Sequence, residues 1–116
     1  MNAMVFDISK VKIFVAIPEG ATEKVRDAMC KAGAGVIGNY SYCTCTVKSL
    51  GTFIPNENAN PTIGENNKLE FVKEEKLEAI ANISDVKSIL KAIREVHPNE
   101  EPAIDIVPLL DENLFL

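Results

Sequence analysis

The chain has 116 residues, of which 47% are hydrophobic and 25% charged, the ordinary composition of one globular domain. Its net charge of −5 argues against nucleic acid as a partner, because phosphates favour clustered Lys and Arg. No apolar run reaches the roughly 18 residues of a membrane span, and residues 1–12 lack a signal-peptide pattern. We therefore expect one cytoplasmic domain over residues 1–116 with no membrane partner, comprising a core of residues 11–109 and a C-terminal tail of residues 110–116.

The first half of the chain predicts a strand, a helix and a second strand. Residues 11–17, VKIFVAI, are almost all apolar and rich in β-branched side chains, which is typical of a central strand. Residues 21–32 place apolar side chains at helical spacing, with Gly33 just after the helix end. A glycine-rich loop at residues 33–40 leads to a strand at residues 40–47. The glycine spacing in that loop does not favour a nucleotide-binding loop.

Three cysteines, Cys30, Cys43 and Cys45, make an odd number in a chain without an export signal, which predicts free thiols. Cys43 and Cys45 share one face of the predicted strand, because side chains alternate along a strand. We expect that face to point into the core, and we expect Cys30 to lie off the apolar face of its helix and to react faster with thiol reagents. The C-x-C pair is also a possible soft-metal site, but no further ligand lies nearby in the sequence.

The second half begins with two extended segments separated by a polar loop. Residues 51–55 are a short extended piece, and residues 56–67 form a loop rich in asparagine. A long charged strand follows at residues 68–81. The alternation that turns Leu77 towards the core also turns Glu75 and Lys73 towards the same face. This strand therefore either bulges or runs past the core edge into solvent or a neighbouring subunit.

The chain then returns through a helix to a last strand. Residues 84–96 carry an apolar helical stripe, with Ser84 as the predicted N-cap and Pro98 beyond the helix end. Residues 103–107 form the last strand, which Pro108 is expected to end. The order is therefore β-α-β-β-α-β. Right-handed crossovers then give a four-stranded antiparallel sheet with both helices on one face, an α+β fold of the ferredoxin-like type.

The turn after the second helix holds the candidate metal ligands His97, Glu100 and Glu101. Imidazole and carboxylate groups suit a divalent ion. The alternative is structural: His97 caps the helix end, where a protonated imidazole is favoured by the helix dipole, and the two glutamates lie in solvent or in an intersubunit ion pair. One histidine and two exposed carboxylates are few ligands for a metal ion, which favours the structural alternative.

Four segments of the chain together resemble a known family: IFVAIPEGATEKVRDAMCKAGAGVIGNYSYCT, GTFIPNENANPTIG, KLEFVKEEKLEAI and HPNEEPAIDIVPL. They resemble the YqfO-type domain, which is usually inserted in larger proteins of the NGG-one-interacting-factor group. The chain also resembles CutA, the divalent-cation-tolerance protein, and more distantly the PII signalling proteins. The larger proteins carry a dinuclear metal site in flanking domains, so the resemblance implies no hydrolase activity for this segment. Asn99 stands where the family usually has an aromatic residue.

The resemblance implies assembly and a ligand. CutA is a trimer whose ferredoxin-like sheets meet edge to edge, so a homo-oligomer is expected here, with a trimer favoured and a dimer second. PII proteins bind small effectors in clefts between subunits. The residues that would border the comparable cleft here, besides the His97 turn, are Gly35, Gly38, Asn39, Tyr40, Asn60 and Gly64.

Three functions remain open at this point. The first is a non-enzymatic oligomeric module that binds a divalent metal ion or a small, anionic metabolite at subunit boundaries. The second is a structural or partner-docking module. The third is a cysteine-dependent enzyme, which needs a base beside its nucleophile; Cys43 with His97 is the available pair, and the expected inward placement of Cys43 opposes it.

Overall fold

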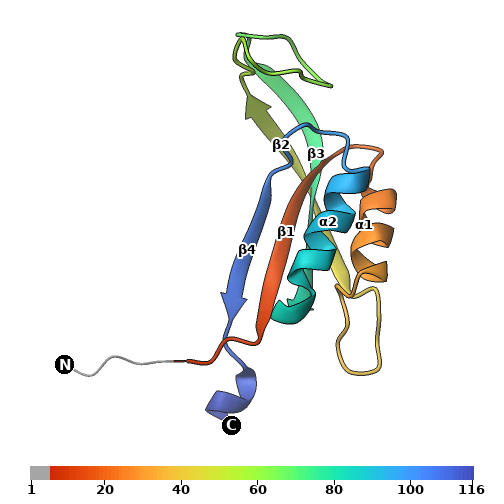
Figure 1. Ribbon diagram of the computed structural model, residues 1–116, viewed down its shortest axis with the longest axis vertical. Coiled ribbons are helices and arrows are strands. Elements are labelled where there is room, and N and C mark those ends of the chain that lie inside the picture. Colours follow the sequence, from red (N-terminus) through yellow and green to blue (C-terminus); the bar gives the residue numbers. More distant parts are fainter. Residues whose placement is uncertain (1–5) are drawn as a thin grey trace, which may run out of the picture.

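The computed structural model describes residues 6–116 as a four-stranded antiparallel sheet with two helices on one face (Figure 1). The spatial order of the strands is β2-β3-β1-β4, so the predicted α+β, ferredoxin-like fold is confirmed. The elements follow in the predicted order: β1 (Lys10–Pro18), α1 (Thr22–Lys31), β2 (Thr44–Phe53), β3 (Glu70–Asn82), α2 (Val86–Val96) and β4 (Ile104–Leu109). Short 3-10 turns at Ile83–Asp85 and Glu112–Phe115 precede α2 and follow β4.

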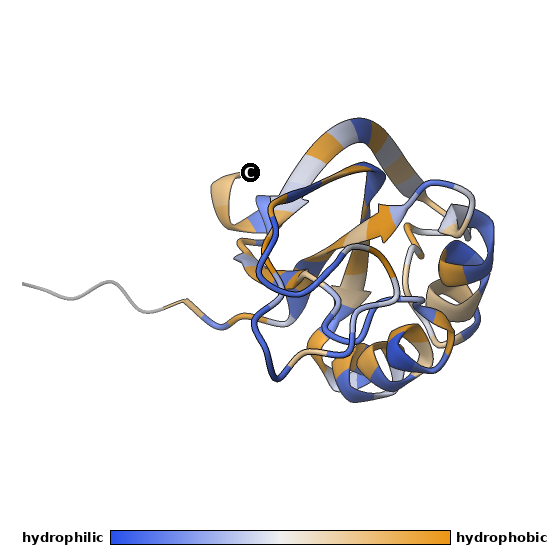
Figure 2. Cartoon of the chain, turned by 90° about the horizontal axis from the view of Figure 1, so that it is seen from above, coloured by the Kyte–Doolittle hydropathy of each residue, from blue (hydrophilic) through white to orange (hydrophobic). Residues whose placement is uncertain are grey.

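The core lies between the sheet and the two helices. Every second side chain of β1 and β3 points to the helices, and each helix turns one stripe of apolar residues to the sheet. Figure 2 shows both helices to one side of the sheet, alternating between hydrophobic and hydrophilic residues. The largest side chains buried in this layer are Ile13, Ile17, Met29, Leu77, Ile89, Ile93, Val15 and Val25.

The hairpin of β2 and β3 extends beyond the rest of the sheet. β1 pairs with β3 only as far as Pro18 opposite Glu74, whereas β2 and β3 remain paired to Phe53 opposite Glu70. Residues 50–73, which we call the arm, therefore project past β1 at the top of Figure 1. The pairing of β2 with β3 is continuous. Of the two alternatives for the long charged strand, running past the core edge is correct.

Two predicted details of β2 are wrong. It is one continuous strand from Thr44 rather than two pieces, and Tyr42 just before it has a φ of 57°. The face of the strand is also reversed: Thr46 lies opposite buried Leu77, whereas Cys45 lies opposite Glu78 on the open face of the sheet. Cys45 therefore does not face the core, and Cys43 precedes the strand and is half-buried. A shift of one residue in strand phase moves every side chain to the other face.

The predicted ends of two later elements also need correction. Asp85 rather than Ser84 is the N-cap of α2, because a 3-10 turn precedes the helix. β4 continues through Pro108 to Leu109. β4 is the last strand of the sheet, and a proline is tolerated on an edge strand when its missing N–H would face away from the neighbouring strand. Gly33 has a φ of 117° immediately after the C-cap of α1, which confirms its predicted position.

Within residues 6–116, none of the helices combines the length and the apolar composition needed to cross a membrane.

Candidate functional site

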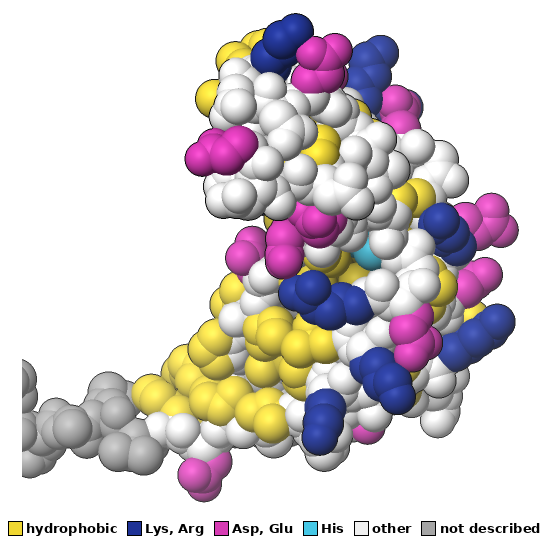
Figure 3. All heavy atoms as spheres, turned by 45° about the horizontal axis from the view of Figure 1, so that its top comes forward, with side chains coloured by type: hydrophobic (Ala, Val, Ile, Leu, Met, Phe, Trp, Pro, Cys, Tyr) yellow, Lys and Arg dark blue, Asp and Glu magenta, His cyan; other side chains and the backbone are white. Residues whose placement is uncertain are grey.

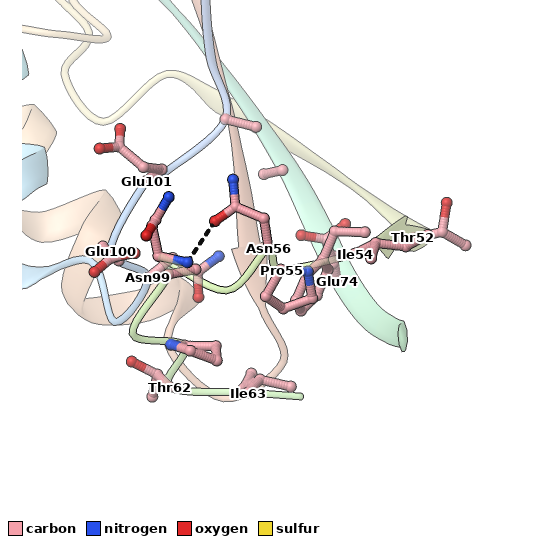
Figure 4. A pocket seen from close by; sticks show the side chains of 16 residues that line it. Thr52, Ile54, Pro55, Asn56, Thr62, Ile63, Glu74, Asn99, Glu100 and Glu101 are labelled. Carbon is pink, nitrogen blue, oxygen red and sulfur yellow. Dashed lines mark hydrogen bonds between the residues drawn. The ribbon is translucent and has the colours of Figure 1, made fainter. Parts of the chain in front are cut away.

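A cleft of about 560 Å³ lies between the arm and the turn that follows α2. Its size is within the range of about 300–1,000 Å³ that is usual for small-molecule sites. Figure 4 shows arm and turn side chains converging on this space. Apolar groups that line it include Ala16, Phe53, Ile54, Pro55, Pro61 and Ile63, and polar groups include Asn56, Asn58, Glu74, Asn99, Glu100 and Glu101.

Two hydrogen bonds join the arm loop to the turn. The hydroxyl of Thr62 donates to the carbonyl oxygen of Pro98 over 2.9 Å. The backbone N–H of Asn60 donates to a carboxylate oxygen of Glu100 over 3.2 Å. These bonds connect segments about 40 residues apart in sequence and fix the position of the loop over the cleft.

The asparagines of the arm loop hold its shape. The side-chain amide of Asn66 donates to the carbonyl oxygens of Asn56 and Ala59, at 2.9 and 3.1 Å. The Asn56 side chain in turn accepts from the N–H of Asn58 over 2.9 Å. Such local amide bonds satisfy backbone groups that have no strand or helix partner. The asparagines thus give the cleft an ordered wall, and this role of Asn56 and Asn66 was not predicted from the sequence.

His97 forms the support behind the turn. It is 8% exposed and is the C-cap of α2. Its Nε2 lies 2.7 Å from the carbonyl oxygen of Ala16, and its Nδ1 accepts the N–H of Asn99 over 3.1 Å. An Nδ1 that accepts must be unprotonated, so the ring is neutral with its proton on Nε2. Burial lowers the pKa of His97, although the bond to Ala16 and the nearby Glu74 raise it.

This arrangement joins two parts of the cleft, because Ala16 and Asn99 both line it. Both nitrogens of His97 are engaged, so binding of a metal ion through this ring would break a hydrogen bond. Within residues 6–116, no group of three His, Cys, Asp or Glu side chains has the arrangement of a metal site. Glu100 and Glu101 line the cleft, whereas His97 lies behind it.

A glycine on the neighbouring strand leaves room for the third carboxylate of the cleft. Glu74 of β3 lies across Gly51 of β2, where the Cβ of any other residue would collide with its carboxylate group. Glu74 is half-buried and belongs to the open face of the sheet. Gly51 is thus required for close approach rather than for an unusual backbone angle.

The glycine-rich loop lies at the other end of the sheet. Gly35 is buried with a φ of 76°, and its N–H donates to the carbonyl oxygen of Ile80, near the end of β3 that is far from the arm. Gly38, Asn39 and Tyr40 are exposed in the same loop, at the bottom of Figure 1. Within one chain, these four residues are not brought together with Asn60 and Gly64 of the arm.

Cys43 and Cys45 are more exposed than predicted, whereas Cys30 lies, as predicted, off the buried face of α1. Cys45 is exposed, and Cys30 and Cys43 are each half-buried. Burial raises the pKa of Cys30, with the nearby Arg26 acting in the opposite direction. Cys43 precedes Thr44, which lies opposite Ala79, whereas His97 bonds to Ala16, which lies opposite Lys76. At about 3.3 Å per strand residue the two side chains are roughly 10 Å apart or more, so they do not form a catalytic pair.

Comparison with known proteins identifies relatives that are much longer. The chain is 47% identical over 104 residues to the GTP cyclohydrolase 1 type 2 homolog of Halalkalibacterium halodurans, covering 90% of this chain and 28% of that protein. The structure of a Bacillus cereus protein related to NIF3 matches with a TM-score of 0.77 and 38% identity, over 92% of this chain and 27% of that one. No family model matches the chain.

The fold is also that of smaller proteins. CutA1 of Shewanella sp. SIB1 matches with a TM-score of 0.66 and 14% identity, covering 91% of this chain and 86% of that one. At such low identity the match shows the fold alone. The 47% identity, in contrast, confirms the resemblance seen in the sequence. The chain is therefore a homologue of one segment of the NIF3-related proteins, the YqfO-like segment, and has the fold of CutA.

Proposed function

We propose that the chain is a non-catalytic, self-associating module that binds a small molecule in the cleft between the arm and the His97 turn. The observation that carries the proposal is the cleft itself. Its walls come from segments distant in sequence, and the Thr62 and Asn60 hydrogen bonds hold them together. Apolar walls with a few convergent polar groups are the usual features of a ligand site.

Self-association follows from the exposed apolar side chains of the arm. Leu50, Ile54, Leu69 and Phe71 are each more than half exposed, at 64%, 61%, 55% and 59%. The arm projects past β1, and β2 is an edge strand with unpaired backbone groups. A second copy of the chain would cover both features. A homo-trimer is the favoured assembly and a dimer the second, as the resemblance to CutA implies.

In such an assembly the cleft would lie at a subunit boundary. The glycine-rich loop and the arm lie at opposite ends of the fold, so only contact between copies can bring Gly35, Gly38, Asn39 and Tyr40 near the arm loop that carries Asn60 and Gly64. This loop also carries Val36, Ile37 and Tyr40 with exposed fractions of 50%, 56% and 76%. Exposed apolar groups at both ends are consistent with a head-to-tail contact.

Two other functions are less well supported. The relatives' name refers to GTP cyclohydrolase, but the chain spans only 28% of the length of the first of them. The separation of Cys43 from His97 disfavours a cysteine-dependent enzyme.

A partner-docking module remains the second candidate, since the exposed apolar arm also suits a different protein. A divalent metal ion, if one binds, would find the carboxylates of Glu74, Glu100 and Glu101 in the cleft.

The test uses three probes with the same aromatic body: 2-phenylethylamine, 2-phenylethanol and 3-phenylpropanoate. We expect at least one to shift the backbone amide resonances of Asn56, Asn58 and Asn99 in the full chain. Ala103→Trp, at an exposed position on the cleft wall, should abolish the shifts by filling the cleft. Ser88→Trp, on the exposed side of α2, is the matched control and should leave them unchanged. If no probe shifts these amides, the ligand-binding proposal is wrong.

A further inference from the structure

The charges around the cleft identify the class of molecule it would take. We propose that it binds a small organic cation, an ammonium or guanidinium group on an apolar body, rather than an anionic metabolite. This inference rests on the proposed function, because it requires that the cleft bind a ligand. It differs from the sequence-based expectation of an anionic effector.

The lining side chains carry charge of one sign only. Sixteen residues line the cleft, and those that ionise are Glu74, Glu100 and Glu101. No Lys or Arg is among these sixteen. In Figure 3, acidic side chains border the hollow between the arm and the rest of the molecule, and basic side chains lie below it. An anionic ligand would therefore face three carboxylates with no cation on the wall to balance them.

Among residues 6–116, no ion pair neutralises these carboxylates. The ion pairs among residues 6–116 join Lys12 to Glu78 and Lys68 to Glu65, so none of the three cleft glutamates takes part in one. His97 beside them is neutral, as its hydrogen bonds require. Lys24 and Arg94 face His97 from α1 and α2, but they do not line the cleft.

Glu74 is the carboxylate best placed to meet a ligand. It comes from a strand rather than a loop, and Gly51 provides the space across which its side chain lies. Glu100, in contrast, already accepts the N–H of Asn60. Glu74 is half-buried on a rigid strand. A carboxylate in such a position gives a stronger charge-assisted hydrogen bond than a carboxylate in open solvent.

The apolar walls account for the rest of the ligand. Phe53, Ile54, Pro55 and Ile63 lie on the arm side of the cleft. They would contact the carbon skeleton of the ligand, and the ring of Phe53 also favours a cation near its face. A bare inorganic cation would leave these groups without a partner. The combination of apolar walls and unpaired carboxylates therefore fits an organic amine.

The three aromatic probes decide the class, because they share one body and differ in charge. Monitored by the amides of Asn56, Asn58 and Asn99 at neutral pH, 2-phenylethylamine should bind about tenfold tighter than 2-phenylethanol, a difference typical of one charge-assisted hydrogen bond. The anion 3-phenylpropanoate should bind most weakly. Glu74→Gln should remove the preference for the amine and leave binding of the alcohol unchanged, whereas Glu23→Gln on the exposed side of α1 should change neither.

Gly51→Ala provides a second variant that keeps the Glu74 carboxylate. The added methyl group displaces only the end of the flexible Glu74 side chain, so the chain should fold and still lose the preference for the amine. If the alcohol or the anion binds at the cleft as tightly as the amine, the cationic class is wrong and the proposed function stands. If none of the three shifts the cleft amides, the proposed function itself fails, and this inference with it.

Discussion

The Nε2 atom of His97 lies 2.7 Å from the carbonyl oxygen of Ala16, although the two residues are 81 positions apart in the chain. This contact fastens the end of α2 to the central strand of the sheet. The other ring nitrogen orders the turn through the N–H of Asn99. One buried imidazole therefore fixes the turn against β1, while the Thr62 and Asn60 hydrogen bonds hold the arm loop to the same turn.

The stability of the protein should fall as the pH is lowered below the usual pKa of histidine. Burial lowers the pKa of His97, so the unfolded chain binds a proton more readily than the folded one. As the pH falls below about 6.5, the usual pKa of histidine, the unfolded state is therefore favoured progressively, until the pH reaches the lower pKa of the folded state. Above about pH 6.5 His97 is neutral in both states, and the effect vanishes. Urea unfolding of wild type and His97→Gln across this window checks the prediction: the variant should lack this component. Equal pH dependence in both proteins would contradict it.

His97→Ala should destabilise the protein by about 2–3 kcal/mol, through two lost hydrogen bonds and a buried carbonyl left without its donor. Its affinity for Zn²⁺ should equal that of wild type, because both ring nitrogens are already engaged within the chain. Calorimetric titration of both folded proteins with Zn²⁺ measures this. A loss of affinity of about tenfold or more in the variant would show that His97 is a metal ligand after all.

The architecture could be predicted from the sequence because the strong patterns are unambiguous. The apolar run of β1 and the helical stripe that includes Ile89 and Ile93 have only one reasonable reading. The segment YSYCTCTV, in contrast, alternates Thr with Cys, two small residues that are equally acceptable on either face of a strand. Its phase was therefore decided by pairing with β3, which places Thr44 opposite Ala79.

The family resemblance implied a cleft near the His97 turn, but the walls that this cleft has within one chain could not be predicted from the residues, because they meet only in the folded chain. The contact between Thr62 and Pro98 depends on how far the arm extends past β1, which no local pattern encodes. The sequence did direct attention to the His97 turn and to Asn60. It gave no sign that Glu74 belongs to the same site, since that residue appears as one more charge in a charged strand.

The three thiols should react with iodoacetamide at different rates, in an order opposite to the sequence-based expectation. Cys45 is exposed on the open face of the sheet and should be modified first, whereas Cys30 should be slower because burial raises its pKa. Mass spectrometry of peptides after short exposure, in dilute protein, gives the rates. Faster modification of Cys30 than of Cys45 would contradict the strand phase described for β2. Protection of Cys45 that increases with protein concentration would show that another copy covers this face.

The arm should determine the assembly. We expect the wild-type chain to sediment as a trimer at micromolar concentration, and Leu50→Asp to shift it to the monomer, because a carboxylate at this 64% exposed position would be buried without a partner between copies. In the isolated fold the same substitution should cost little, since the side chain is already in solvent. Leu114→Asp, at a 54% exposed position in the C-terminal 3-10 turn, is the matched control and should remain a trimer. A monomeric wild-type protein would refute self-association, and a trimeric Leu50→Asp variant would move the interface away from the arm.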